Sequence, residues 1–140
     1  MFVIYASVVS NWCLPEESHP YAVAAKARLA EEDAVTSAIF WFELRNVLLV
    51  AERRGRITEA QTTALLSSIG ALPINEDHDQ DERVLFSLAR TYRLSIYDAA
   101  YLELAKREGF ALASLDKALL VAAKAEKVSL VGEPEANIST

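Results

Sequence analysis

Glu43, Asp98 and Asp116 are the acidic residues whose positions best suit chemistry. On a helical wheel Glu43 shares an apolar face with Val47, although carboxylates normally occupy the exposed face. A carboxylate buried without a partner costs several kcal/mol, so Glu43 needs a cation, a donor or a metal beside it. Asn46 is a polar companion one turn later. A backbone donor or an arginine from another element would satisfy Glu43 equally well.

Asp98 and Asp116 each stand where a helix is expected to begin. Ser95 and Asp98 fit the capping pattern [ST]-x-x-[DE], and Asp116 follows the apolar segment "FALAS" with Ser114 two residues earlier. Taken alone, helix capping explains both acids. Convergence favours a functional interpretation, because all three acids belong near one end of a parallel sheet. Clustered carboxylates repel one another unless a hard cation such as Mg²⁺ or Mn²⁺ lies among them.

Short apolar segments alternate with helical patterns along the chain. Strands are predicted at residues 2–4, 34–37, 71–74, 110–114 and 128–132. Helices are predicted after a small-residue turn at Ala6 and Ser7, and at residues 18–31, 39–55, 58–69, 76–92, 95–109 and 116–127. This alternation predicts an α/β/α sandwich with a central, mostly parallel sheet.

The acidic run at residues 75–82 could be imagined as a second metal site with His78. We interpret it instead as the solvated first turn of the helix 76–92, where acids complement the helix dipole. Trp12, Trp41 and Phe42 could stack on bases, but aromatic residues among apolar neighbours are typical of a core or an interface.

The composition predicts a single domain at residues 1–132, followed by a loosely held tail at residues 133–140. No apolar run approaches the roughly 20 residues that cross a bilayer, and no leader is visible, so we expect a cytoplasmic protein without membrane contact. The net charge of −6 argues against a broadly basic nucleic-acid surface. A nuclease can nevertheless hold its substrate through cations bound to its own carboxylates.

Four segments, in this order and at these spacings, resemble a known family: "VIYASVVSNWCLPEE", "FELRNVLLVAERRGRIT", "LSIYDAAYLELAKREG" and "LASLDKAL". They resemble the PIN-domain ribonucleases of the VapC type, which are the toxic half of bacterial and archaeal toxin–antitoxin pairs. The resemblance implies that Glu43, Asp98 and Asp116 fill three of the family's four acidic metal-binding positions. It also implies a catalytic role for Ser114 and supporting roles for Ser7 and Asn46.

The resemblance further implies the activity and partners. Mg²⁺ or Mn²⁺ would activate a water molecule and polarise an RNA phosphodiester, so the chain would be a metal-dependent endoribonuclease. Arg45 and Lys117 are candidates to hold RNA phosphates. The implied partners are a second copy of the chain and a VapB-type antitoxin that places a basic side chain in the acidic pocket.

Tyr5 stands where the family has its fourth acid, an aspartate. A phenol with an ordinary pKa near ~10 is neutral at pH 7 and is a poorer Mg²⁺ ligand than a carboxylate. We therefore hypothesise the architecture of a PIN nuclease with strongly reduced activity. The alternative is an inactive module that binds antitoxin, RNA or both. A phosphatase or receiver domain is disfavoured, because its aspartate after the first strand would stand at position 5.

Overall fold

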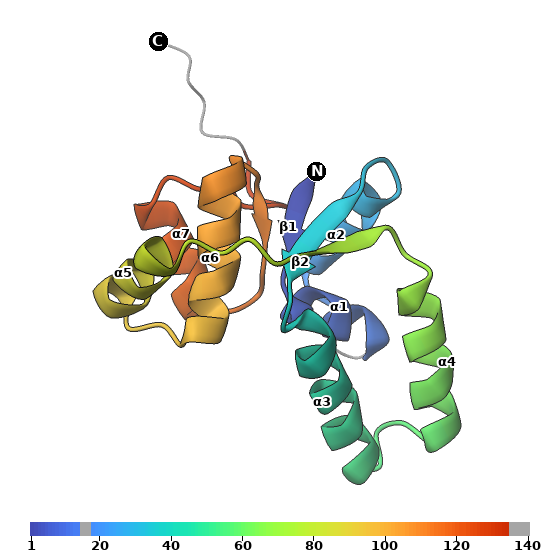
Figure 1. Cartoon of the computed structure of the whole chain (residues 1–140). Helices are drawn as coiled ribbons and strands as arrows, with labels where there is room; N and C mark the ends of the chain where they lie inside the picture. The colour runs from blue at the N-terminus through green and yellow to red at the C-terminus, as the bar shows by residue number, and fades with distance from the viewer. Residues whose placement is uncertain (15–17, 135–140) are drawn as a thin grey trace.

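A computed structural model describes residues 1–14 and 18–134 of the chain. Four parallel strands form a sheet in the order β3-β2-β1-β4 (Figure 1). Their bounds are Phe2–Ile4 (β1), Ala34–Ser37 (β2), Ile74–Asp77 (β3) and Leu112–Ala113 (β4). The predicted parallel α/β sandwich is thus confirmed. Residues 15–17 of the opening motif and 135–140 of the predicted tail lie outside the described residues.

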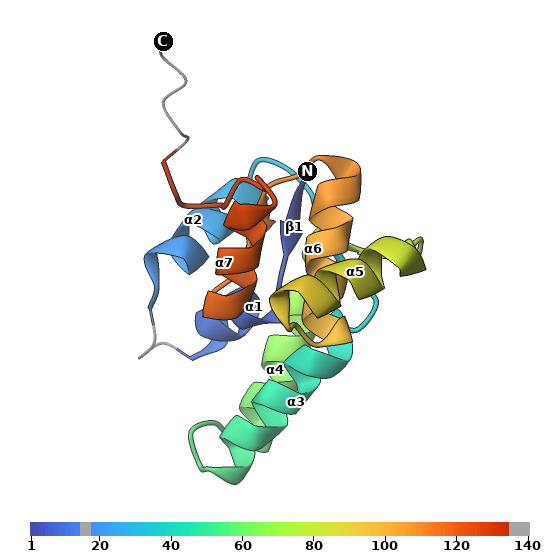
Figure 2. The same ribbon diagram turned by 90° about the vertical axis from the view of Figure 1, so that its left-hand side faces the viewer.

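Helices cover both faces of this sheet (Figures 1 and 2). They are α1 (Ala6–Cys13), α2 (Pro20–Leu29), α3 (Phe40–Arg53), α4 (Glu59–Gly70), α5 (Glu82–Tyr92), α6 (Ile96–Glu108) and α7 (Lys117–Ala125). Successive side chains of a strand point to opposite faces. Phe2 and Ile4 accordingly pack in the core beneath α1 to α3, whereas Val3 packs in the core beneath α5 to α7. Among the described residues, no helix is long and apolar enough to span a membrane.

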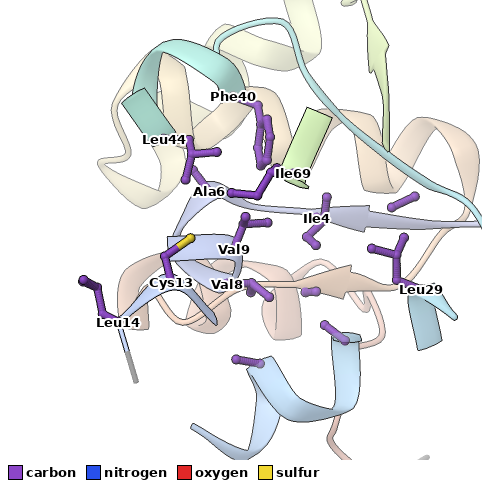
Figure 3. Packing of buried hydrophobic residues seen from close by; sticks show 14 of the residues in the cluster. Ile4, Ala6, Val8, Val9, Cys13, Leu14, Leu29, Phe40, Leu44 and Ile69 are labelled. Atoms are coloured by element: carbon purple, nitrogen blue, oxygen red, sulfur yellow. The ribbon is translucent and has the colours of Figure 1, made fainter. Parts of the chain in front are cut away.

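The α3 helix packs against α1, and the first turn of α3 lies close to the end of β1. Phe40 and Leu44 of α3 are fully buried and belong to the same core cluster as Ala6 and Val9 of α1 (Figure 3). Because Glu43 is next to Leu44, this packing fixes the start of α3, and Glu43 with it, beside the central strand.

Three predicted strands and one predicted helix start differ from the structure. The strand predicted at residues 110–114 is limited to Leu112–Ala113 (β4). The third strand begins at Ile74 instead of residue 71 and continues through Glu76 and Asp77, because these residues pair with β2. An edge strand tolerates such charges because one of its sides faces solvent. The acidic run is therefore not a helical turn, and α5 begins only at Glu82. The predicted strand 128–132 is reduced to one bridge, between Leu112 and Leu130.

The opening of α1 also differs, because no turn separates it from β1. Ala6 is already helical, and Tyr5 occupies the N-cap position with an extended backbone. The chain thus passes from the central strand into a helix at one residue. Residue 5 is therefore fixed by the strand before it and by the helix after it.

A capping box opens α4, at the start of the helix predicted at residues 58–69. The Gln61 amide donates to Thr58 Oγ1 over 3.1 Å, and the Thr58 amide donates to Gln61 Oε1 over 2.8 Å. We expect Thr58→Ala to lower the free energy of unfolding by about 1 kcal/mol, because it exposes helix donors without a partner. Urea denaturation measures this. Thr63→Ala is the control, since that hydroxyl only donates to the Glu59 carbonyl within the helix; equal losses in both variants would contradict the prediction.

Candidate active site

Tyr5 lies at the carboxyl end of the central strand. Its amide donates to the Ala113 carbonyl over 3.0 Å, and its carbonyl accepts from the Val8 amide over 3.1 Å. In open α/β sheets, ligands bind outside the carboxyl ends of the strands. These main-chain bonds direct the Tyr5 side chain into the region where the sequence predicts the acids to gather.

Asp98 lies in the first turn of α6 and is bonded to Tyr5. The Tyr5 hydroxyl donates to Asp98 Oδ1 over 2.6 Å. Helix capping is done by Ser95, whose Oγ accepts from the Asp98 amide over 3.1 Å. The Asp98 carboxylate is therefore not needed for helix capping and can act in the site, where its partner is the neutral hydroxyl of Tyr5.

Glu43 lies in the first turn of α3, half-buried at the edge of the helix's apolar face. Its partner is Tyr101, whose hydroxyl donates to Glu43 Oε1 over 2.7 Å. Burial raises the pKa of Glu43 and the charge of Asp98 adds to this, whereas the Tyr101 hydrogen bond opposes it. Asn46, predicted as a companion on this face, is exposed instead, because the deeply buried line of α3 runs through Leu44 and Leu48.

Asp116 caps α7, as its position after a strand indicates. Its Oδ1 accepts from the Leu119 amide over 2.9 Å. The two predicted serines shape the loop before it: Ser114 Oγ accepts from the Asp116 amide, and Ser7 Oγ accepts from the Leu115 amide over 3.0 Å. Ser7 thereby joins the start of α1 to this loop. This bond keeps Asp116 at the same end of the sheet as Tyr5.

The three acids act together on Tyr5. Burial is the main cause that raises the pKa of Tyr5, followed by the hydrogen bond to Asp98 and the charges of Asp98, Glu43 and Asp116. Tyr5 is therefore a neutral hydrogen-bond donor among carboxylates at physiological pH. Its ring contacts the ring of Tyr101 edge to face, with centroids 4.5 Å apart.

The site residues do not fit a divalent cation as they are arranged. Among residues 1–14 and 18–134, no three His, Cys, Asp or Glu side chains are close enough together to hold a metal ion. One oxygen each of Asp98, Glu43 and Asp116 already accepts a protein hydrogen bond. That these acids are metal ligands stays a prediction.

Sequence reasoning missed Tyr101, which is fully buried. It could have been found, because Tyr101 follows Asp98 by three residues on α6 and therefore lies on the same helix face. The buried Thr36 hydroxyl lies beside Tyr101 and donates to the Ile4 carbonyl over 2.7 Å. Tyr101 thus joins the acid of α3 to α6, next to Thr36 of β2.

The residues predicted to contact RNA lie on the surface. Arg45 and Lys117 are exposed, and the Arg45 guanidinium lies over the Phe42 ring at 5.5 Å from its centroid. Phe42 itself is 66% exposed. The Trp12 indole instead donates to the Ala22 carbonyl over 2.7 Å, which holds α1 against α2. RNA contact at Arg45 and Lys117 stays a prediction.

Residues 3–125 match the profile of the family described as the PIN domain. The chain belongs to the PIN-domain family. Ribonuclease VapC3 of Pyrobaculum aerophilum is 29% identical to this PIN domain over 121 residues, which cover 84% of this chain and 90% of that protein. The predicted resemblance to VapC-type PIN-domain ribonucleases is thereby confirmed.

Solved structures share the PIN fold of this chain. FitAcB from Neisseria gonorrhoeae superimposes with a TM-score of 0.65 at 18% identity, covering 93% of this chain and 96% of that one. PAE2754 from Pyrobaculum aerophilum gives 0.60 at 22% identity, with 86% and 83% covered. VapC20 from Mycobacterium tuberculosis, described as a toxin that cleaves the sarcin-ricin loop, gives 0.56 at 14% identity, with 87% and 95% covered. These similarities support the PIN fold independently of the sequence motifs.

Proposed function

We propose that this chain is the toxin of a type II toxin–antitoxin pair, with a PIN site for cleaving RNA phosphodiester bonds that Tyr5 strongly impairs. The observation that carries this proposal is the 2.6 Å hydrogen bond from the Tyr5 hydroxyl to Asp98. It lies at the carboxyl end of the central strand, in a family where a relative is named a ribonuclease. A neutral phenol there removes one negative charge from the site, and that charge would otherwise favour cation binding.

The roles of the residues follow from this proposal. In a chain with an acid at position 5, Asp98, Asp116 and Glu43 would bind Mg²⁺ or Mn²⁺, which supplies an activated water and neutralises phosphate charge. Ser114 and Ser7 would keep Asp116 in place through the loop bonds described above. Arg45 and Lys117 would hold phosphates of the substrate.

The proposed substrate is RNA with exposed bases, since only unpaired bases can be read readily by protein side chains. The proposed partners are a second copy of the chain and a VapB-type antitoxin, and the proposed location is the cytoplasm. The names of VapC3 and FitAcB support a toxin–antitoxin assignment. An arginine of the antitoxin could pair with the carboxylates bidentately.

A second candidate function is a non-catalytic PIN module that retains antitoxin or RNA binding. The same two phenol–carboxylate bonds favour it, because they leave the acids satisfied without any cofactor. The two functions differ in whether the natural chain cleaves RNA at all.

RNA cleavage by the natural chain and by Tyr5→Asp tests the proposal, each with Mn²⁺, with Mg²⁺ and with EDTA. We expect Tyr5→Asp to cleave at least about tenfold faster with metal, because groups that tune a metal site change affinity or activity by about 10–100-fold. Tyr5→Phe is the matched control: it keeps the ring, adds no acid and should stay slow. Equal cleavage by the natural chain and Tyr5→Asp would show that Tyr5 does not impair the site. Cleavage by neither, over a panel of RNAs, would favour the non-catalytic module.

A further inference from the structure

Tyr5 and Tyr101 together form what we call the phenol pair. Their hydroxyls donate to Asp98 over 2.6 Å and to Glu43 over 2.7 Å, and their rings pack edge to face. Carboxylates close to one another need a positive charge or donors between them. In this chain two neutral donors meet that need.

The phenol pair is held by contacts with several elements of the fold. Tyr5 is fixed by its main-chain bonds to β4 and α1, and Tyr101 is fully buried on α6. Thr36 of β2 lies beside Tyr101 and donates to the Ile4 carbonyl at the end of β1. Glu43 adds α3 to the network. Neither phenol can swing aside without breaking its partly buried hydrogen bond to a carboxylate, and such a loss is costly.

A divalent cation would have to displace this network. Mg²⁺ requires oxygen ligands at about 2.0–2.1 Å in nearly octahedral geometry and favours carboxylates. Here one oxygen of Asp98 and one of Glu43 already accept a hydrogen bond from a phenol, and Tyr5 lies near enough to Asp98, Glu43 and Asp116 for their charges to raise its pKa. A cation bound here would meet the neutral oxygen of a phenol in place of a carboxylate oxygen. Its binding would also break the two hydrogen bonds from the phenols to Asp98 and Glu43.

We infer that the phenol pair replaces a divalent cation in this PIN domain, so that the folded chain neither binds nor needs one at this site. The inference deepens the proposed function and rests on its assignment of the acids. It adds Tyr101 as a positioning residue for Glu43. It also predicts that the stability of the natural chain is independent of metal, whereas the stability of Tyr5→Asp depends on metal.

Binding and melting of the purified chain, without RNA, test this inference. We expect electron paramagnetic resonance to detect no Mn²⁺ bound to the natural chain or to Tyr5→Phe at millimolar metal, whereas Tyr5→Asp should bind at least about tenfold more tightly. The melting temperature of the natural chain should be the same in Mn²⁺ and in EDTA. That of Tyr5→Asp should be lower in EDTA and rise with Mn²⁺, because a ligand that binds only the folded state stabilises it.

Tyr101→Phe provides a second readout that does not depend on metal. It should lower the melting temperature in EDTA, because Glu43 loses its donor, whereas Tyr97→Phe on the exposed surface of the same helix should leave it unchanged. Binding of Mn²⁺ by the natural chain at millimolar metal would overturn the inference, and this titration needs no variant to fold. Because no RNA is present, a failure of the nuclease proposal would appear only in the cleavage assay.

Discussion

In a chain that already carries Tyr5→Asp, the further replacement Asp116→Asn is expected to reduce RNA cleavage by at least about 100-fold. The replacement removes the charge of Asp116 but keeps an oxygen that can accept from the Leu119 amide. Asparagine is as good an N-cap as aspartate, so α7 should remain intact. The loss would therefore report the carboxylate's part in the chemistry, measured as initial cleavage rates with saturating Mn²⁺.

Asp81→Asn is the matched control for this experiment. Asp81 caps α5 with the same type of bond, to the Val84 amide over 3.1 Å, but it lies in the exposed stretch before that helix. Its replacement should leave cleavage unchanged. If both asparagine variants cleave as well as the Tyr5→Asp parent, Asp116 is only a helix cap and the proposed ligand set is wrong.

Arg107→Met is expected to lower the free energy of unfolding by about 3 kcal/mol, the lower end of the range for breaking a buried ion pair. Glu103 is 1% exposed, and its two oxygens accept from Arg107 Nε over 2.8 Å and Nη2 over 3.0 Å. The same guanidinium reaches Asp77 at the end of β3 over 2.6 Å. The hydrogen bonds to Glu103 and Asp77 raise the pKa of Arg107, so it is charged at any pH at which the protein folds.

The free energy of unfolding is measured by chemical denaturation. The control for the loss of a positive charge on α6 is Lys106→Met, measured in the same way. Lys106 pairs with Glu126 on the surface, where such pairs contribute at most about 1 kcal/mol. The double replacement Glu103→Met with Arg107→Met should recover much of the loss, because the fully buried Glu103 charge is then no longer left unpaired. A loss for Arg107→Met no larger than that for Lys106→Met would show that water satisfies Glu103 without the arginine.

Local patterns predicted the elements whose ends are set by local chemistry. The capping box at Thr58, the serine cap at Ser95 and the glycine at position 109, which has a positive φ, mark helix ends without reference to the rest of the chain. The bounds of β3 could not be predicted in this way. Glu76 and Asp77 are extended only because β2 lies beside them, and their charges argue for a helix start when they are considered alone.

The same distinction between local and long-range features applies to the candidate site. The acids and Tyr5 could be placed because each lies at the end of a strand or in the first turn of a helix. The hydrogen bonds that pair them could not be predicted, because the bonds from Tyr5 to Asp98 and from Tyr101 to Glu43 join residues 93 and 58 positions apart. Such pairings depend on how α3 and α6 meet at the sheet, and a pattern of adjacent residues does not contain that information.

The main-chain bonds of residue 5 have a genetic consequence. They are made by an amide and a carbonyl, which every residue except proline provides in full. Whatever side chain the gene specifies is therefore presented at the same point of the fold. Tyrosine and aspartate codons differ only in their first base, so a single point mutation separates the two forms of this site. The PIN scaffold can thus present either tyrosine or aspartate at position 5 without a change in the main-chain bonds that hold this residue.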